Sequence, residues 1–239
     1  MSGAMLRLQD VHARYGRSEV LRGISMEVRA GEWFCLLGPN GAGKSTLLHC
    51  IGTQVEPSSG QIEINGHSLQ VAPVPAKRSL GFGASPEQLP GLLTGRQCLE
   101  IYAMAKELPA IDERTLALAA SLGFTPYMDR CVDTYSLGTR QKLCILLALL
   151  GDPRLVVLDE AFNGLDPRSA LVLKRHLRQR LSDESCALLL ATHSLDIVEH
   201  YADRAALLID GLIARQWNRG DLDKLREQGG NALEEAVSA

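Results

Sequence analysis

The sequence lacks three features that would each assign it to a class of protein. It has no excess of positive charge, because its 239 residues carry a net charge of −3 at pH 7 and an isoelectric point near 6.1. We therefore expect no nucleic acid as a partner. It has no long apolar run, since residues 143–150 form the longest one and a membrane-spanning helix needs about 20. If the protein works at a membrane, we expect another chain to span it.

The sequence also lacks the C-x-x-C spacing of metal and redox sites. Its six cysteines are Cys35, Cys50, Cys98, Cys131, Cys144 and Cys186. Several lie in apolar segments, where a reduced cysteine packs as a small hydrophobic residue. The first residues show no charged and apolar regions of a signal peptide, so we expect a cytosolic protein. With 46% hydrophobic residues, the chain is long enough for one domain with a subdomain.

The most informative segment is a loop directly after an apolar run at residues 34–37. Its residues are Gly38, Pro39, Asn40, Gly41, Ala42, Gly43, Lys44, Ser45 and Thr46. They fit the pattern G-x-x-x-x-G-K-[ST], whose glycines let backbone N–H groups point at phosphate oxygens. Lys44 is expected to neutralise phosphate and Ser45 to offer a hydroxyl to Mg²⁺. A pattern typical of a buried helix follows at residues 45–51. The strand, the loop and the helix thus follow one another as a nucleoside-triphosphate site requires.

Two later apolar segments end in side chains suited to phosphoryl chemistry. Asp159 and Glu160 follow residues 155–158, which read as a parallel strand covered on both faces. We expect Asp159 to hold Mg²⁺ and Glu160 to polarise water for attack on the γ-phosphate. His193 follows the next such segment and would reach the same phosphate and water. Alone, an acidic pair after a strand is more often a loop start or helix cap, and a lone histidine more often a surface residue. The phosphate loop in the same chain favours the functional interpretation.

Tyr15 is the candidate for binding the base of the nucleotide. It is expected just before the first long strand, and an aromatic face suits a flat adenine ring. The alternative is an ordinary tyrosine of a β-hairpin.

The order of patterns predicts an α/β fold, with a phosphate-loop ATPase core of mostly parallel sheet flanked by helices, an antiparallel β layer and an inserted α-helical subdomain. Strand patterns dominate the first third, including a hairpin at Asn65-Gly66. Helix caps are expected at Thr94, Asp112, Ser136 and Asp166. The expected divisions are residues 1–85 (first part of the core), 86–151 (helical subdomain), 152–219 (second part of the core) and 220–239 (helical tail).

These motifs together resemble the nucleotide-binding subunit of ATP-binding cassette transporters, over nearly the whole chain. The resemblance rests on Tyr15, residues 38–46, residues 135–141 (YSLGTRQ), residues 158–160 (LDE), residues 164–167 (GLDP) and His193. Residues 135–141 are the most diagnostic, because other phosphate-loop ATPases and kinases lack such a signature segment. In the family, two cassettes sandwich two ATP molecules. The resemblance implies that Ser136 and Gly138 contact ATP on the partner cassette, and that Asp166 links the two sites.

The resemblance also implies ATP and Mg²⁺ as cofactors, with Glu160, His193 and Lys44 as the catalytic residues. It implies an integral membrane transporter subunit on a separate chain, a second cassette that forms a homodimer, and a peripheral location on the cytoplasmic face of the membrane. Residues 92–103 resemble exporter-type cassettes, so we expect export.

Two positions depart from the pattern of the family. Leu137 occupies a position that is usually glycine, and Thr139 one that is usually glutamine. Ser85 stands where the family has a glutamine that senses Mg²⁺, with Gln88 as a possible replacement. A cassette that binds ATP without hydrolysing it is one alternative, although Lys44 and Glu160 are both present. The others are a soluble cassette acting on ribosomes or DNA, and a kinase that shares only the phosphate loop.

Overall fold

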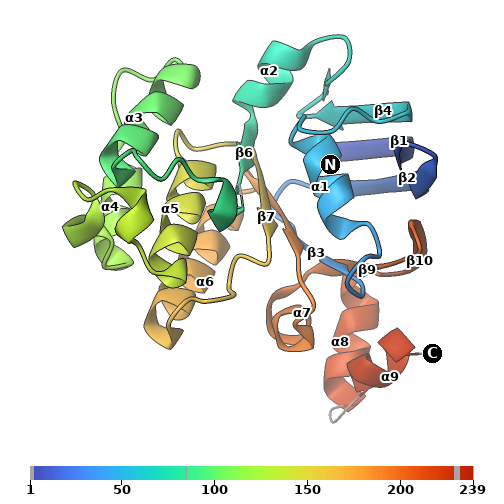
Figure 1. The fold of residues 1–239 in the computed structure, drawn as a ribbon. Helices are drawn as coiled ribbons and strands as arrows, with labels where there is room; N and C mark the ends of the chain where they lie inside the picture. The colour runs from blue at the N-terminus through green and yellow to red at the C-terminus, as the bar shows by residue number, and fades with distance from the viewer. Residues whose placement is uncertain (1–2, 84, 229–231, 239) are drawn as a thin grey trace.

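The computed structural model describes residues 3–83, 85–228 and 232–238, which form two sheets with helices around them (Figure 1). The antiparallel sheet has the order β2-β1-β4-β5 and the larger sheet the order β10-β9-β3-β8-β7-β6. The strands are β1 (Ala4–Tyr15), β2 (Ser18–Arg29), β3 (Trp33–Leu37), β4 (Ser59–Ile64), β5 (His67–Ser68), β6 (Leu80–Phe82), β7 (Leu155–Asp159), β8 (Ala187–Ala191), β9 (Arg204–Ile209) and β10 (Leu212–Trp217). The predicted fold class is confirmed.

The larger sheet is parallel from β6 to β9, and only β10 pairs in the antiparallel sense. All five residues of β3 and of β8 are buried, as expected of parallel strands covered on both faces. Alternate residues of β3 serve two cores. Trp33 and Cys35 face the core on the side of the helical segment, while Phe34 and Leu36 face the core under the antiparallel sheet.

Nine helices lie around the sheets in the part of the chain that the structure describes, and those with predicted caps begin at these caps. The nine are α1 (Lys44–Ile51), α2 (Pro73–Arg78), α3 (Gly95–Ala105), α4 (Glu113–Ser121), α5 (Leu137–Leu149), α6 (Pro167–Leu181), α7 (Leu195–Tyr201), α8 (Arg219–Gln228) and α9 (Ala232–Ser238), with short 3₁₀ turns η1 (Pro86–Gln88), η2 (Thr125–Tyr127) and η3 (Val132–Thr134). Thr94 and Gln97 form the predicted capping box. Asp112, Ser136 and Asp166 each accept a hydrogen bond from the third residue of the helix that they cap.

Three elements were not predicted from the sequence. The turn at Asp210-Gly211 is followed by β10, which makes a hairpin with β9. The short β6 and α2 were also missed, because three to six residues carry too little periodicity. The predicted hairpin at Asn65-Gly66 is present, and both residues have positive φ angles of 50° and 76°. Of the six cysteines, which are all free thiols, only Cys131 is exposed.

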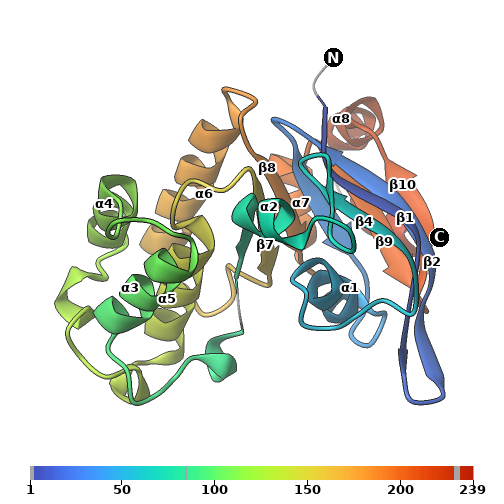
Figure 2. The ribbon, with the colours of Figure 1, turned by 90° about the horizontal axis from the view of Figure 1, so that it is seen from above.

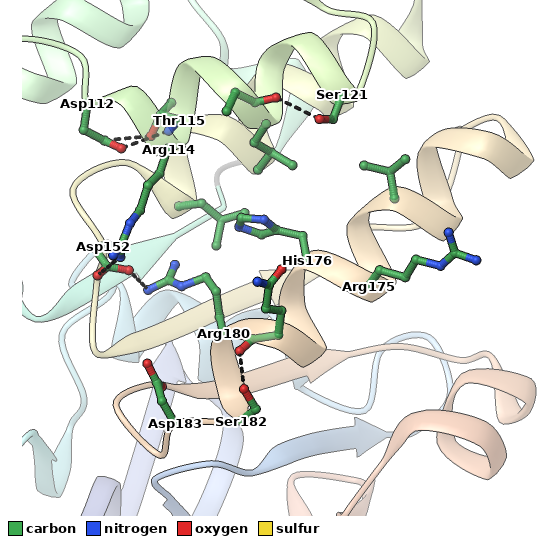
Figure 3. Close-up of a pocket in the computed structure, with 15 residues that line it drawn as sticks. Asp112, Arg114, Thr115, Ser121, Asp152, Arg175, His176, Arg180, Ser182 and Asp183 are labelled. Carbon is green, nitrogen blue, oxygen red and sulfur yellow. Dashed lines mark hydrogen bonds and ion pairs between the residues drawn. The ribbon is translucent and has the colours of Figure 1, made fainter.

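Helices α3, α4 and α5 form a layer beside the sheets, seen on the left in both overall views (Figures 1 and 2). A cleft of about 700 Å³ lies between α4 and α6, and its lining includes the charged side chains of Arg114, Arg175 and Arg180 and the imidazole of His176 (Figure 3). Asp152 and Asp183, at its edge, precede the amino ends of β7 and β8. The cleft therefore lies at the sheet edge opposite the phosphate loop.

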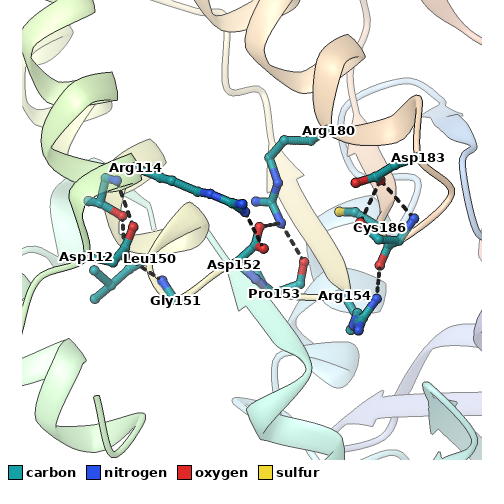
Figure 4. A network of polar contacts seen from close by, with 12 residues as sticks. Asp112, Arg114, Leu150, Gly151, Asp152, Pro153, Arg154, Arg180, Asp183 and Cys186 are labelled. Atoms are coloured by element: carbon teal, nitrogen blue, oxygen red, sulfur yellow. Dashed lines mark hydrogen bonds and ion pairs between the residues drawn. The ribbon is translucent and has the colours of Figure 1, made fainter. Parts of the chain in front are cut away.

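Residues 150–153, where the chain returns from the helices to the sheet, are held from three elements, and Figure 4 shows the contacts of Asp152 with two of them. The Asp152 carboxylate accepts from Arg114 of α4 at 2.7 Å and from Arg180 of α6 at 2.6 Å. The Lys106 ammonium, just after α3, donates to the Leu150 carbonyl at 2.8 Å. This network fixes the position of the helical layer at residues 150–153, which we call the return crossing. Among the described residues, no helix combines the length and apolar composition needed to cross a bilayer.

A first prediction concerns the contact between β6 and α5. A Cβ added at Gly81 would lie 1.9 Å from the Ala148 carbonyl oxygen, so the strand or the helix would have to move. We expect Gly81→Ala to lower the free energy of unfolding by about 2 kcal/mol or more, as overpacking does. The measurement is urea unfolding at equilibrium.

Gly220→Ala is the matched control for this prediction. Its Cβ would have its nearest neighbour at 3.4 Å, and Gly220 lies in α8, so stability should be unchanged or slightly higher. Equal stability of the two variants would contradict the packing argument.

Candidate nucleotide-binding and catalytic site

The phosphate loop connects β3 to α1, as the sequence predicts. Gly43 caps α1 with a φ angle of 108°, and a Cβ there would lie 3.0 Å from Leu21 of β2. Only glycine adopts this backbone conformation without strain. The loop is also tied at Ala42, whose carbonyl accepts from the Gly211 N–H at 3.1 Å. The β1–β2 hairpin and the β9–β10 hairpin therefore both contact the phosphate loop and fix its shape.

Lys44 is the first residue of α1, and its side chain is directed into the loop. Its ammonium donates to the carbonyls of Gly38 at 2.6 Å and Pro39 at 3.1 Å, and the residue is only 7% exposed. Asn40 and Gly41 are exposed at the tip. A positive charge enclosed by a glycine-rich loop at a helix N-terminus suits the phosphate chain of a nucleotide.

Ser45 and Asp159 are in direct contact, although 114 positions separate them in the sequence. The Ser45 hydroxyl donates to the Asp159 carboxylate at 2.7 Å. Hydroxyl and carboxylate oxygens are the donors that Mg²⁺ prefers, and the ion usually takes few protein ligands beside phosphate and water. Within the described residues no group of three or more His, Cys, Asp or Glu side chains could hold a metal. The pair therefore fits Mg²⁺ bound together with a nucleotide.

Glu160 and His193 also meet, as predicted. His193 Nδ1 lies 2.8 Å from Glu160 Oε1, and the histidine side chain is 63% exposed. Glu160 has a positive φ of 46°, and its N–H donates to the Ala191 carbonyl at 3.0 Å, so the end of β7 is tied to the end of β8. A carboxylate beside an exposed imidazole can polarise a water and hold a phosphate oxygen.

Two neighbours of Glu160 were missed from the sequence. Thr192 Oγ1 lies 3.4 Å and Asn163 Nδ2 lies 3.3 Å from Glu160 Oε2. Both donate to the carboxylate oxygen that does not contact His193, and so restrict its rotation. Thr192 directly precedes His193, and this adjacency was the available signal. Nothing in the sequence distinguishes Asn163 from an ordinary loop residue.

The signature segment begins α5 and packs on the loop before α6. Ser136 accepts from the Thr139 N–H at 3.3 Å, and a Cβ at Gly138 would lie 2.5 Å from the Gly164 carbonyl oxygen. Lys142 pairs with Asp166 at 3.1 Å. Hydrogen bonds from Ser169, with the Lys142 ammonium, hold the pKa of Asp166 well below its usual range. Within the described residues, neither Ser136 nor Gly138 hydrogen-bonds to the phosphate loop.

Tyr15 is the last residue of β1, and the expectation that it precedes the first long strand is wrong. It pairs with Ser18 at the hairpin end, and 52% of it is exposed. The strand after this turn reaches the phosphate loop, because a Cβ at Gly43 would lie 3.3 Å from the Val20 carbonyl oxygen. The exposed ring of Tyr15 therefore lies on a hairpin that contacts the phosphate loop. Stacking of this ring on adenine stays a prediction.

Comparison with known proteins extends these observations. The model of the family described as ABC transporter matches residues 21–163. A second family model, described as AAA domain, putative AbiEii toxin, matches residues 129–199. The chain is 35% identical over 230 residues to the uncharacterized ABC transporter ATP-binding protein YdbJ of Bacillus subtilis, covering 95% of this chain and 74% of that protein.

The chain belongs to the ABC transporter family.

A solved structure, entitled ATP binding subunit of ABC transporter, superposes on this cassette with a TM-score of 0.86 and 29% identity, covering 98% of this chain and all of that one. The cassette is also 35% identical over 213 residues to ATP-binding cassette sub-family A member 7 of Rattus norvegicus. That match covers 87% of this chain and 10% of the rat protein. The cassette thus spans about a tenth of the length of its mammalian relative.

Ser85 occupies the position at which the resemblance implies a Mg²⁺-sensing glutamine. It lies directly before η1, and its hydroxyl donates to the Glu87 carboxylate. This hydrogen bond lowers the pKa of Glu87. Within the described residues, no hydrogen bond joins Ser85 to Ser45 or Asp159. The hydroxyl is therefore directed to its own turn, and we expect a water to complete the coordination of Mg²⁺.

The second prediction follows from this geometry. Ser85→Ala should change the rate of ATP turnover less than ten-fold, because it removes one hydrogen bond to an exposed carboxylate. Ser85→Gln restores the residue usual in the family and is the matched variant. Turnover is measured as phosphate release at saturating Mg²⁺ and ATP. A ten-fold loss for Ser85→Ala, about 1.4 kcal/mol of barrier, would show that the hydroxyl takes part in the reaction.

Proposed function

We propose that this cassette binds and hydrolyses ATP and drives transport through a separate membrane subunit. The observation that carries the proposal is the pair of contacts at one sheet edge, Ser45 with Asp159 at 2.7 Å and Glu160 with His193 at 2.8 Å. These side chains lie at or after the ends of three different strands, and none of them belongs to the hydrophobic cores. The chemistry of these residues matches that of a phosphate-loop ATPase.

Each residue has one role in the proposed reaction. Lys44 neutralises phosphate charge, and the hydroxyl of Ser45 and the carboxylate of Asp159 would hold Mg²⁺. Mg²⁺ held there would supply positive charge to offset the charge that develops on the phosphate oxygens. Glu160 accepts a hydrogen bond from the attacking water and orients it. His193 donates a hydrogen bond to the γ-phosphate, and its contact with Glu160 keeps the imidazole at the site.

The active form would be a homodimer. Ser136 and the N–H groups at the start of α5 would face the γ-phosphate of ATP on the second copy, where the helix dipole favours negative charge. Leu137 is 57% exposed at this position. The Lys142–Asp166 pair ties α5 to the loop before α6, which supports a role of Asp166 in linking the two sites.

The membrane subunit would dock beside α3. Exposed apolar side chains gather on α3 and the turn before it, and they are Leu92, Ile101, Tyr102 and Met104. Leu92 is 88% and Met104 71% exposed, so their apolar surface is accessible to a partner. A short cytoplasmic helix of an exporter, seated between the core and the helical layer, would cover them. The cassette would then lie on the cytoplasmic face of the membrane.

The third prediction tests hydrolysis. Glu160→Gln should retain ATP binding and nearly abolish turnover, because an amide preserves the shape but cannot orient water as a carboxylate does. The expected product is a stable ATP-bound dimer, detected by size-exclusion chromatography with ATP. Glu160→Gln combined with Lys44→Ala is the control, which should remain monomeric. Wild-type turnover by a monomeric Glu160→Gln protein would refute the role of Glu160.

The fourth prediction tests the membrane partner. Expressed alone, the cassette should remain in the supernatant after ultracentrifugation, and it should sediment with membranes only when its transporter subunit is co-expressed. Leu92→Ser combined with Met104→Ser should abolish sedimentation without changing the ATP affinity. Stoichiometric binding to ribosomes would instead support a soluble cassette, as would equal membrane association without the partner.

A further inference from the structure

The arginine at position 226 binds the carboxyl end of a neighbouring helix. Its guanidinium, on α8, donates to the carbonyls of Glu199, Val198 at 3.3 Å and Ala202 at 2.6 Å, all at the end of α7. A helix leaves its last carbonyls without partners, and a cation near them is stabilising. Asp223, one turn earlier on α8, pairs with the same guanidinium at 2.6 Å and orients it. A single side chain of the tail thus binds three carbonyls at the end of α7, of which that of Val198 also accepts from the Ala202 N–H at 3.2 Å.

Helix α7 needs such contacts because it is short. It has seven residues, and an isolated helix of this length is unstable in water. A second arginine, Arg178 of α6, donates to the Tyr201 carbonyl, and the Tyr201 ring packs 5.4 Å from the Trp33 ring. The carboxyl end of α7 is therefore held from both α6 and α8 (Figure 1).

The other end of α7 leads directly to the catalytic site. Ser194 caps the helix and His193 precedes it, so His193 and Arg226 act at opposite ends of one helix about 10 Å long. The imidazole is 63% exposed, and the contact with Glu160 is its one hydrogen bond among the described residues. Few side-chain contacts restrain His193, so its position depends on the backbone that enters α7.

We propose that Arg226 is a positioning residue for His193, and that α8 thereby takes part in ATP hydrolysis. The inference rests on the proposed function, in which His193 holds the γ-phosphate. When Arg226 is absent, the last turn of α7 loses three hydrogen bonds and frays. The fraying shortens an already marginal helix, and the Ser194 cap and the imidazole then occupy several orientations. ATP binding through Lys44 and Ser45, on the other side of β3, is unaffected.

The test compares Arg226→Met with Arg215→Met in the full chain. Arg215 of β10 donates to the Ala236 carbonyl of α9 at 3.0 Å, so the control also removes an arginine–carbonyl bond of the tail, but not one on α7. We expect Arg226→Met to lower kcat for ATP about ten-fold with KM nearly unchanged, and Arg215→Met to leave both unchanged. Arg226→Lys, which keeps the charge but cannot reach three carbonyls, should lie between them.

Two further measurements separate positioning from a general loss of stability. Amide hydrogen exchange should become faster in α7 of Arg226→Met than in α7 of Arg215→Met, while α1 keeps its protection. In a His193→Ala background, Arg226→Met should change kcat less than about two-fold, because the residue that it positions is gone. An equal loss of kcat in both backgrounds would overturn the inference, as would unchanged exchange in α7.

The outcomes also distinguish this inference from the proposed function. If His193→Ala lowers kcat strongly but Arg226→Met does not, the inference fails and the proposed function stands. If His193→Ala hydrolyses ATP at the wild-type rate, the proposed role of His193 fails, and the inference fails with it.

Discussion

The structure depends on the parallel order β3-β8-β7 in the larger sheet. The carboxyl ends of parallel strands meet at one edge, so the loops after these strands are neighbours in space whatever their separation in the sequence. The phosphate loop follows β3, Glu160 follows β7, and His193 follows β8 by two residues. β8 lies between the other two strands, and the Glu160 N–H bonds to the last residue of β8. The contacts of the site are consequences of this order, which buried apolar strands maintain.

Much of this arrangement could be predicted, because it depends on interactions between residues that are close together in the sequence. Thr94, Asp112, Ser136 and Asp166 are short polar side chains before apolar helical patterns, and each caps a helix. The strands β7 and β8 were also predictable, because each contains a continuous run of apolar residues. The phosphate loop was predictable because few residues other than glycine adopt its backbone conformation. In each case the determining interaction lies within a few residues of the signal.

The remainder could not be predicted, because it depends on contacts between distant segments. Lys142 is an ordinary basic residue of α5 until the fold places it 3.1 Å from Asp166. Asn163 is a loop residue until the turn after β7 directs its amide at Glu160. From the sequence, Leu137 is only a departure from the glycine that the resemblance implies. In the fold, its side chain extends over Gly164, where a Cβ would lie 3.5 Å from it, so part of it is covered by its own chain.

Helix α6 contacts three parts of the molecule that are far apart in the sequence: α5, the return crossing and α7. Its cap, Asp166, is paired with Lys142, near the middle of the signature helix α5. Near its other end, Arg180 binds Asp152, where the helical layer returns to the sheet, and Arg178 binds the Tyr201 carbonyl of α7. A helix of fifteen residues is a rigid rod about 22 Å long, so these contacts cannot shift independently. A movement of α5 against the sheet must therefore either carry α6 with it or break the Lys142–Asp166 pair. The two arginines at its far end oppose the first outcome, because they join α6 to the return crossing and to the helix behind His193.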